Sequence, residues 1–157
     1  MYRYTGELCH LKDNYETMWR YLNYLQGFIK DGLCCEGVAD WLALLDVGDI
    51  VPREVLVTMF CGYVTALFRK IALLLGHTED ADVAGEWYAA IRNAYRQKYG
   101  ALKLNCQALY AMELIYDFSD DRERTLALLI ETLEKRKSSH VFGDRGMVLQ
   151  SSGRISH

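Results

Sequence analysis

Apolar residues recur at steps of three and four along most of the chain, which predicts helices with one apolar face. Three segments are amphipathic in this way: residues 11–29, 78–99 and 120–137. Their apolar positions are Leu11, Tyr15, Met18, Trp19, Leu22, Leu25 and Ile29; Ala81, Ala84, Tyr88, Ile91 and Tyr95; and Leu126, Leu129, Ile130 and Leu133. We expect Thr78 to cap the second of these helices, and Ser119 or Asp120 the third.

Two further segments, 52–75 and 104–117, are apolar around much of their circumference. This pattern predicts helices buried on more than one side. Pro52 suits a first helical turn and Gly76 a C-terminal cap.

The broadly apolar helices alternate with the amphipathic ones, as a double layer of inner and outer helices requires. No segment shows the alternation of period two that is typical of strands. The sequence therefore predicts an all-α fold of antiparallel helical hairpins. We expect residues 1–140 to form one helical domain and residues 141–157 a weakly structured C-terminal tail.

Residues 31–51 interrupt the helical pattern, with three glycines and two adjacent cysteines. Loops of about 20 residues are uncommon in compact domains and are often functional. This segment holds Glu36, Asp40 and Trp41, and it is where we expect a binding site.

Composition narrows the classes of function. Eighteen basic and 21 acidic residues give a net charge of −3, so no basic face favours nucleic acid or an anionic membrane. The longest apolar stretches are interrupted by Arg, Lys or Gly well before about 20 residues, which predicts no membrane span. The N-terminus has no signal-peptide pattern, so we expect a cytoplasmic protein.

Cysteine and histidine positions suggest no cofactor chemistry. The five cysteines are odd in number and lack a CxxC spacing, which favours reduced and mostly buried thiols. The four histidines are scattered without a spaced partner, so we expect neither a metal site nor a cofactor.

Several short stretches, in order along the chain, resemble the catalytic domain of bacterial α-L-rhamnosidases, glycoside hydrolase family 78. They are similar to its T-G-D and L-x-x-x-Y-x-x-M opening, its G-D-W-L-A segment, a helix ending K-I-A-x-x-L-G, and its Q-T-A-Y-A-L run. The matching stretches are Tyr4–Glu7, Leu11–Met18, Val38–Ala43, Lys70–Gly76 and Gln107–Ala111.

The resemblance implies an (α/α)₆ toroid and inverting hydrolysis of terminal α-L-rhamnosyl residues. It implies that Asp40 accepts hydrogen bonds from sugar hydroxyls and that Trp41 packs on the sugar face. We place Glu36 in the same substrate-binding group because it lies close to Asp40. Ala39 replaces the family's usual Gly, which changes the backbone freedom before Asp40. In the alternative interpretation, Asp40 caps a short helix that begins at a buried Trp41.

The family's general acid and general base motifs are not found in this sequence, so the catalytic residues are unknown. The chain supplies five or six helices, roughly half a ring. We therefore expect a fragment that is inactive alone, whose uncovered inner flanks favour self-association or the remainder of a larger chain. Two alternatives stay open: a helical-repeat protein-interaction module without enzymatic activity, and a truncated gene product with no activity.

Overall fold

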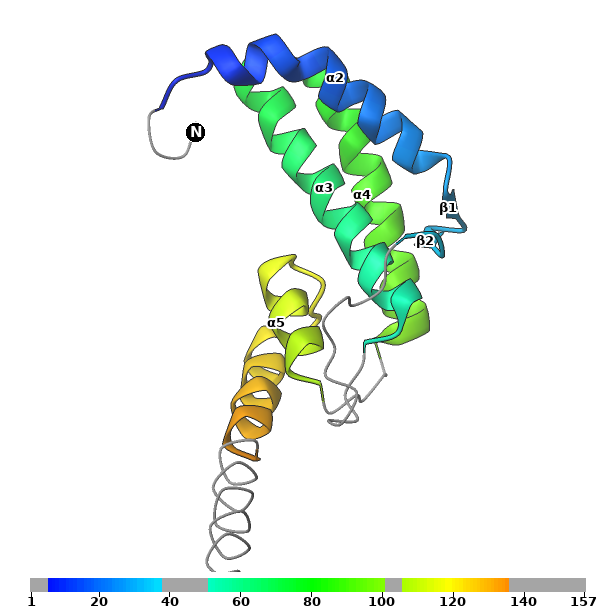
Figure 1. The fold of residues 1–157 in the computed structure, drawn as a ribbon, viewed down its shortest axis with the longest axis vertical. Coiled ribbons are helices and arrows are strands. Elements are labelled where there is room, and N and C mark those ends of the chain that lie inside the picture. The colour runs from blue at the N-terminus through cyan, green and yellow to red at the C-terminus, as the bar shows by residue number, and fades with distance from the viewer. Residues whose placement is uncertain (1–5, 38–50, 101–105, 136–157) are drawn as a thin grey trace, which may run out of the picture.

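The computed structural model describes residues 6–37, 51–100 and 106–135 of the chain. In chain order these residues form α2 (Cys9–Gln26), β1 (Ile29–Lys30), β2 (Leu33–Cys34), α3 (Arg53–Leu75), α4 (Thr78–Tyr99) and α5 (Gln107–Ile115). Residues 122–135 are also helical. The predicted all-α class of antiparallel hairpins is confirmed (Figure 1). The predicted tail, 141–157, lies outside the described residues.

The centre of the fold is the antiparallel pair of α3 and α4 (Figure 1). Gly76 ends α3 in the left-handed conformation, with φ 85°, as predicted from the sequence. The amide of His77 donates to the carbonyl of Ala72 at 2.9 Å, and α4 begins at once. Because the connection consists only of Gly76 and His77, α3 and α4 must pack side by side in antiparallel orientation.

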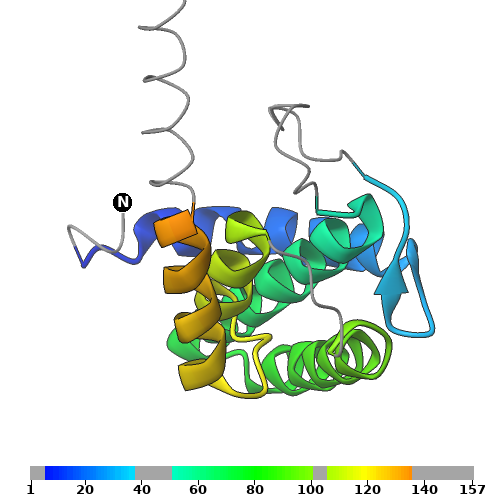
Figure 2. The same ribbon diagram turned by 90° about the horizontal axis from the view of Figure 1, so that it is seen from below.

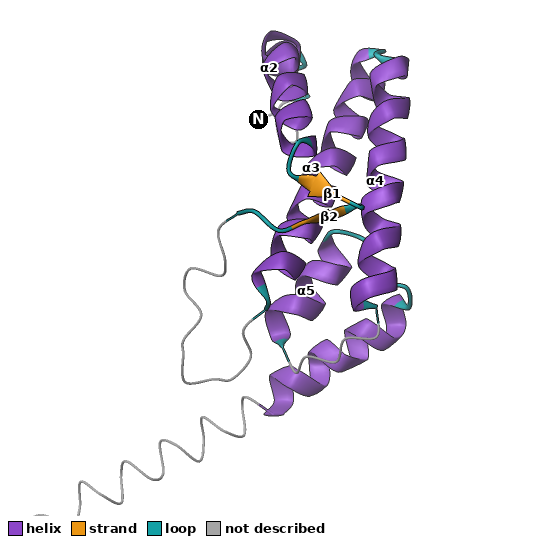
Figure 3. Cartoon of the chain, turned by 90° about the vertical axis from the view of Figure 1, so that its right-hand side faces the viewer, coloured by secondary structure: helices purple, strands orange, loops and turns teal. Residues whose placement is uncertain are grey.

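The remaining helices extend this pair on two sides. α2 packs along the upper part of α3 and α4, while α5 and helix 122–135 form a second hairpin beside the lower part (Figures 1 and 2). Seen from the side, the small hairpin of β1 and β2 lies against α3 and α4 (Figure 3). The chain thus forms an arc of helices rather than a closed ball.

The larger core joins α3, α4, α5 and the turn after α5. Phe118 is 1% exposed and meets the Tyr95 ring edge-on, at a centroid distance of 4.9 Å. The buried members of this core are Val51, Val55, Met59, Ile91, Tyr95, Tyr99, Cys106, Leu109, Tyr110 and Phe118. Burial of this many large apolar side chains is the main stabilising contribution of the second hairpin.

A second core holds α2 on the α3–α4 pair. Trp19 stacks on Phe68 at 5.1 Å and on Trp87 at 5.6 Å. The Tyr15 hydroxyl donates to Oδ2 of Asp80 at 2.7 Å, and burial together with this carboxylate raises the pKa of Tyr15. The buried members are Tyr15, Leu22, Phe68, Ala72, Ala81 and Ala84.

The predicted apolar stripes of the first two amphipathic helices are confirmed. Every predicted stripe residue within α2 and α4 is buried or half-buried. Ile29 is half-buried as well, but it does not belong to the predicted helix, because α2 ends at Gln26 and Ile29 lies in β1.

Both predicted N-caps are wrong. Thr78 is the first residue of α4, and His77 occupies the cap position without a side-chain hydrogen bond, because the His77 carbonyl already accepts from the amide of Ala81 at 3.1 Å. The later helix is capped by Asp121, whose Oδ1 accepts from the amide of Arg124 at 3.0 Å. The two predicted candidates have other partners: the Ser119 and Thr125 hydroxyls lie 2.8 Å apart, and Asp120 pairs with Arg96.

The hairpin of β1 and β2 contradicts the expectation that no strand is present. Ile29 pairs with Cys34 and Lys30 with Leu33, which leaves Asp31 and Gly32 as a two-residue turn. Both have positive φ, 51° and 76°, as a type I′ turn demands. Asp-Gly is a strong hairpin signal, and two-residue strands are too short to show alternation.

Two apolar stripes remain uncovered among the described residues. One, the α3 stripe, consists of Phe60, Leu67 and Leu74, each more than 40% exposed. The other, the 126–133 stripe, consists of Leu126, Ile130 and Leu133, which are 48%, 48% and 37% exposed. These three belong to the apolar face predicted for residues 120–137, and the expectation that an amphipathic helix buries this face is wrong for them: helix 122–135 buries Thr125 and Thr132 instead.

α3 is also long and apolar enough to cross a membrane, judged by length and composition alone. Core helices of soluble proteins satisfy the same test, and half of its apolar window is buried within this chain. The expected absence of a membrane span stays a prediction.

Candidate functional site

The predicted binding loop leaves from the end of the β1–β2 hairpin and returns at the start of α3. Thr58 of α3, fully buried, holds the hairpin. Its Oγ1 accepts from the amide of Cys34 at 3.0 Å and donates to the carbonyl of Cys34 at 3.2 Å. One threonine thus satisfies both backbone groups of the last strand residue, which fixes the place where the loop begins.

The hairpin fits its groove because Gly32 has no side chain. A Cβ at this position would lie 2.6 Å from Cβ of Ala94 and 2.8 Å from the carbonyl oxygen of Ala90. Residue 32 also has a φ of 76°, which disfavours any L side chain. Close approach and backbone conformation therefore both require glycine here.

Of the three predicted substrate-binding residues, the structure places one. Glu36 is exposed just before the loop, and its backbone carbonyl accepts from Sγ of Cys34 at 3.4 Å. Among the described residues its carboxylate has no ion pair or hydrogen bond. Asp40 and Trp41 lie outside the described residues, so their grouping with Glu36 stays a prediction.

A charged group at the start of α3 adjoins the loop's return point. Nζ of Lys98 lies 2.7 Å from Oε1 of Glu54, and Sγ of Cys35 donates to the same oxygen at 3.2 Å. The Lys98 hydrogen bond is the largest cause that lowers the pKa of Glu54 to about 2. Glu54 is therefore a fixed anion at neutral pH that ties α3 to the end of α4, and it is unsuited to general-acid catalysis.

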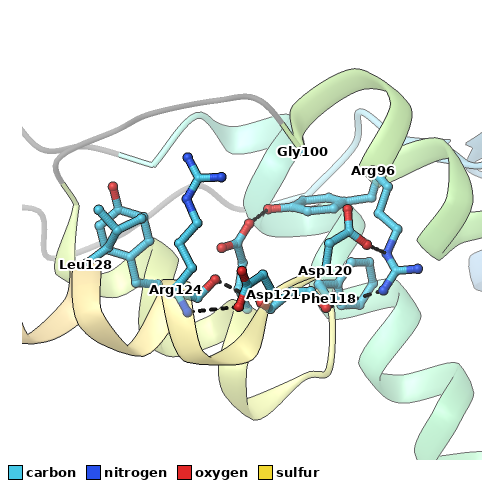
Figure 4. A pocket seen from close by; sticks show the side chains of 12 residues that line it. Arg96, Gly100, Phe118, Asp120, Asp121, Arg124 and Leu128 are labelled. Atoms are coloured by element: carbon cyan, nitrogen blue, oxygen red, sulfur yellow. Dashed lines mark hydrogen bonds and ion pairs between the residues drawn. The ribbon is translucent and has the colours of Figure 1, made fainter.

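A pocket of about 380 Å³ opens between the end of α4, α5 and the start of helix 122–135 (Figure 4). Sequence reasoning did not indicate it, because its residues come from separate segments of the chain. Charged side chains gather on its wall, with Arg96 and Asp120 side by side (Figure 4). Its lining consists of Tyr95, Arg96, Gly100, Tyr110, Glu113, Phe118, Ser119, Asp120, Asp121, Arg124, Thr125 and Leu128.

The pocket's central polar contact joins Glu113 and Tyr95. The Tyr95 hydroxyl, on a side chain only 1% exposed, donates to Oε1 of Glu113 at 2.7 Å. Burial raises the pKa of Glu113, the charge of Asp120 adds to the rise, and the Tyr95 hydrogen bond partly opposes it. Burial together with Glu113 also raises the pKa of Tyr95.

The other polar groups of the pocket are largely paired with one another. Nε of Arg96 lies 2.5 Å from Oδ1 of Asp120, and Nη2 of Arg96 donates to the carbonyl of Ser119 at 3.3 Å. These contacts hold the turn between α5 and helix 122–135. Among the described carboxyl groups with a resolved pKa shift, only Glu113 has a raised pKa, which makes it the pocket's candidate proton donor.

One group of described residues has metal-ligand chemistry that the sequence did not suggest. Ligand atoms of Glu7, Cys9 and His10 lie within 4.8 Å of one another. All three are exposed at the start of α2, where the helix dipole disfavours a cation. The expected absence of a metal site stays a prediction.

Comparisons with known proteins agree with this architecture. The family model of the bacterial alpha-L-rhamnosidase six-hairpin glycosidase domain matches residues 1–148. None of the curated proteins matches the chain.

Two solved structures share the fold. One is the alpha-L-rhamnosidase of Streptomyces avermitilis complexed with L-rhamnose. It aligns with a TM-score of 0.75 and 24% sequence identity, and the alignment covers 87% of this chain and 13% of that chain. The other is the alpha-L-rhamnosidase from Dictyoglumus thermophilum. It aligns with a TM-score of 0.63 and 20% sequence identity, and the alignment covers 85% of this chain and 16% of that chain. The chain thus spans a small part of each of these enzymes. By the match over residues 1–148, it belongs to the bacterial α-L-rhamnosidase six-hairpin glycosidase domain family.

Proposed function

We propose that this chain forms part of the (α/α)₆ catalytic domain of an α-L-rhamnosidase. Joined to the remaining hairpins, it contributes to the inverting hydrolysis of terminal α-L-rhamnosyl residues; alone it does not turn over substrate. The observation that carries the proposal is the family match over residues 1–148, combined with coverage of only 13% and 16% of the two similar enzymes.

The family's general acid and general base motifs are not found in this sequence, which supports the proposed inactivity of the isolated chain. Inverting glycosidases need two carboxyl groups about 6.5–9.5 Å apart, one as acid and one to activate water. Of the two described carboxyl groups with a resolved pKa shift, Glu113 has a raised pKa, which suits an acid, and Glu54 is held ionised by Lys98. We propose that this chain contributes contacts with the sugar through the segment after Glu36. In that segment Asp40 accepts hydrogen bonds from sugar hydroxyls and Trp41 packs on the sugar face.

Three of the five free cysteines, Cys34, Cys61 and Cys106, are buried. Buried reduced thiols suit a reducing compartment, and we propose a cytoplasmic location on this ground. Fractionation of cells that produce the native gene product, followed by detection of the chain, tests it; recovery outside the cytoplasm would contradict it.

An aryl α-L-rhamnoside assay tests the inactivity of the isolated chain. We expect no release of aryl alcohol above the rate in buffer, whereas clear turnover would show that an acid and base pair is present in this chain.

A product of the whole coding region around the chain tests its place in the enzyme. We expect it to release rhamnose that appears first as the β-anomer in NMR spectra, because inversion at C1 converts an α-glycoside into a β-product. Replacing Asp40 by Asn in that product should reduce hydrolysis. Full activity of the Asn variant would remove Asp40 from the site, and an α-anomer would contradict inversion.

A further inference from the structure

Two buried thiols lie where the β1–β2 hairpin packs against α3, and the proposed sugar contacts use neither of them. We propose that Cys34 and Cys61 form a reversible disulfide with each other when the chain meets the disulfide of a low-molecular-weight thiol, such as glutathione disulfide. The bond ties the start of the predicted binding loop to α3. Both cysteines belong to this chain, so the proposal depends neither on the enzymatic function nor on further hairpins.

The packing of the hairpin on α3 brings the two thiols together. Cys34 and Cys61 are each 2% exposed, and they form a small core cluster with Val57. Thr58 fixes the backbone of Cys34 against α3 through its two hydrogen bonds, at 3.0 and 3.2 Å. Cys61 lies three residues after Thr58, so its side chain is on the same side of α3. The two cysteines therefore meet across the contact between hairpin and helix.

The pKa of Cys61 reflects the same contact. Burial raises this pKa, and the neighbouring Cys34 thiol adds to the rise through its charge and a side-chain hydrogen bond. Sγ of Cys34 also donates to the carbonyl of Glu36 at 3.4 Å. Cys61 is therefore protonated at neutral pH and unreactive while the hairpin is closed, because the thiolate is the nucleophile.

The other three cysteines lie elsewhere. Cys9 is exposed at the start of α2. Cys35 is exposed as well, and its Sγ donates to Oε1 of Glu54 at 3.2 Å. Cys106 is buried in the larger core, away from the hairpin cluster. Cys34 and Cys61 are thus the two cysteines that share one core cluster.

The disulfide forms by two exchange steps after the hairpin opens. Opening is local, because each strand has only two residues and short hairpins have low stability. The Cys34 thiolate attacks one sulfur of glutathione disulfide, and a glutathione thiolate leaves. The Cys61 thiolate then attacks Sγ of Cys34 and displaces the second glutathione thiolate. The two cysteines lose two electrons and two protons, which glutathione disulfide takes up to become two molecules of glutathione.

Peptide mapping of the oxidised chain tests the pair. The folded chain is incubated with glutathione disulfide, its remaining thiols are alkylated, and its tryptic peptides are analysed by mass spectrometry. We expect peptide 31–53 joined to peptide 54–69 as the main disulfide product, and separation of the two by dithiothreitol. Glutathione adducts without the joined peptides would overturn the proposal. So would the same mixture of disulfides from the folded and the urea-unfolded chain.

Cysteine variants assign the bond, because peptide 31–53 contains both Cys34 and Cys35. Cys35→Ser is the matched control and should give the joined peptides in unchanged yield. Cys34→Ser and Cys61→Ser should each reduce the yield more than about tenfold, since each removes one of the two reacting sulfurs. Fragmentation of the joined wild-type peptides assigns the bond without any variant, and a bond to Cys35 would contradict the proposal.

Urea unfolding of the oxidised and the reduced chain tests whether the bond fits the native contact. The disulfide closes a ring that contains residues 35–60 and so removes conformations from the unfolded chain. We expect oxidation to lower the unfolding equilibrium constant by about 30-fold or more. An oxidised chain that is no more stable than the reduced chain would show that the bond distorts the fold, and it would contradict a native pair.

Discussion

The two sides of α3 differ in what they touch far more than in their composition. On one side Val55, Met59 and Ala72 are fully buried against α2, α4 and α5. On the other, Phe60, Leu67 and Leu74 are more than 40% exposed. Both sides carry large apolar residues, so the difference lies in which neighbours the described residues supply.

The largest expected effect is a difference in the free energy of unfolding between variants of two adjacent residues, one on each side of α3. Met59→Ala should lower the free energy of unfolding by about 2–5 kcal/mol, since a fully buried side chain leaves a cavity. Phe60→Ala, on the open side, should cost less than about 1 kcal/mol when the chain is monomeric. Urea unfolding at low protein concentration measures both. Equal losses would mean that the open side is covered in solution.

A smaller effect distinguishes two buried threonines of α3. Thr58→Val removes both hydrogen bonds to Cys34, leaves a buried amide without a partner, and should cost about 1–3 kcal/mol. Thr65→Val is the matched control. Its hydroxyl bonds only to the carbonyl of Cys61, one turn earlier in the same helix, so the loss should stay below about 1 kcal/mol.

Amide hydrogen exchange adds a local test of the Thr58 contact. Thr58→Val should speed the exchange of the Cys34 amide, and Thr65→Val should not. Unchanged exchange at Cys34 in Thr58→Val would show that another group holds the hairpin.

The smallest effects concern two glutamates whose pKa values shift in opposite directions. The pKa of Glu54 is lowered, so its contribution to stability is present above pH 4.5 and is lost as pH falls toward about 2. The pKa of Glu113 is raised, so its contribution is present below its unfolded pKa and is lost as pH rises through the raised value.

Glutamine variants measure these two contributions. Glu54→Gln should destabilise the chain at pH 7 but have little effect near pH 2, with a difference below about 1 kcal/mol because the pair is partly exposed. Glu113→Gln should be better tolerated at pH 7 than at pH 4. Thermal unfolding from pH 2 to 8 measures both, and parallel curves for the two variants would contradict the assigned directions.

The periodicity of apolar residues alone was sufficient to predict the helices that bury one face within this chain. The stripes of α2 and α4 were predicted residue by residue, because a step of three or four fixes which side chains share a face. The Gly76 cap was likewise predictable, since few other residues adopt the left-handed conformation. The hairpin at 29–34 was missed although its Asp-Gly turn was visible, because strands of two residues carry no alternation.

The site was less accessible to sequence reasoning. Glu36 lies exposed just before the predicted loop, whereas the roles of Asp40 and Trp41, which lie outside the described residues, stay predictions. The pocket around Glu113 has no sequence signal, because Tyr95, Glu113 and Asp120 meet only when α4, α5 and the following turn pack together.

The sequence by itself determined the helices, their apolar faces and the family. Only the tertiary structure decided which apolar faces are covered: α3 buries one side, and helix 122–135 turns Thr125 and Thr132 inward with Leu126 and Ile130 outward. The physical reason is that apolarity is a property of a residue, whereas burial depends on neighbours. α4 and α5 pack against one side of α3 and bury it, and no described element covers the side that carries Phe60, Leu67 and Leu74.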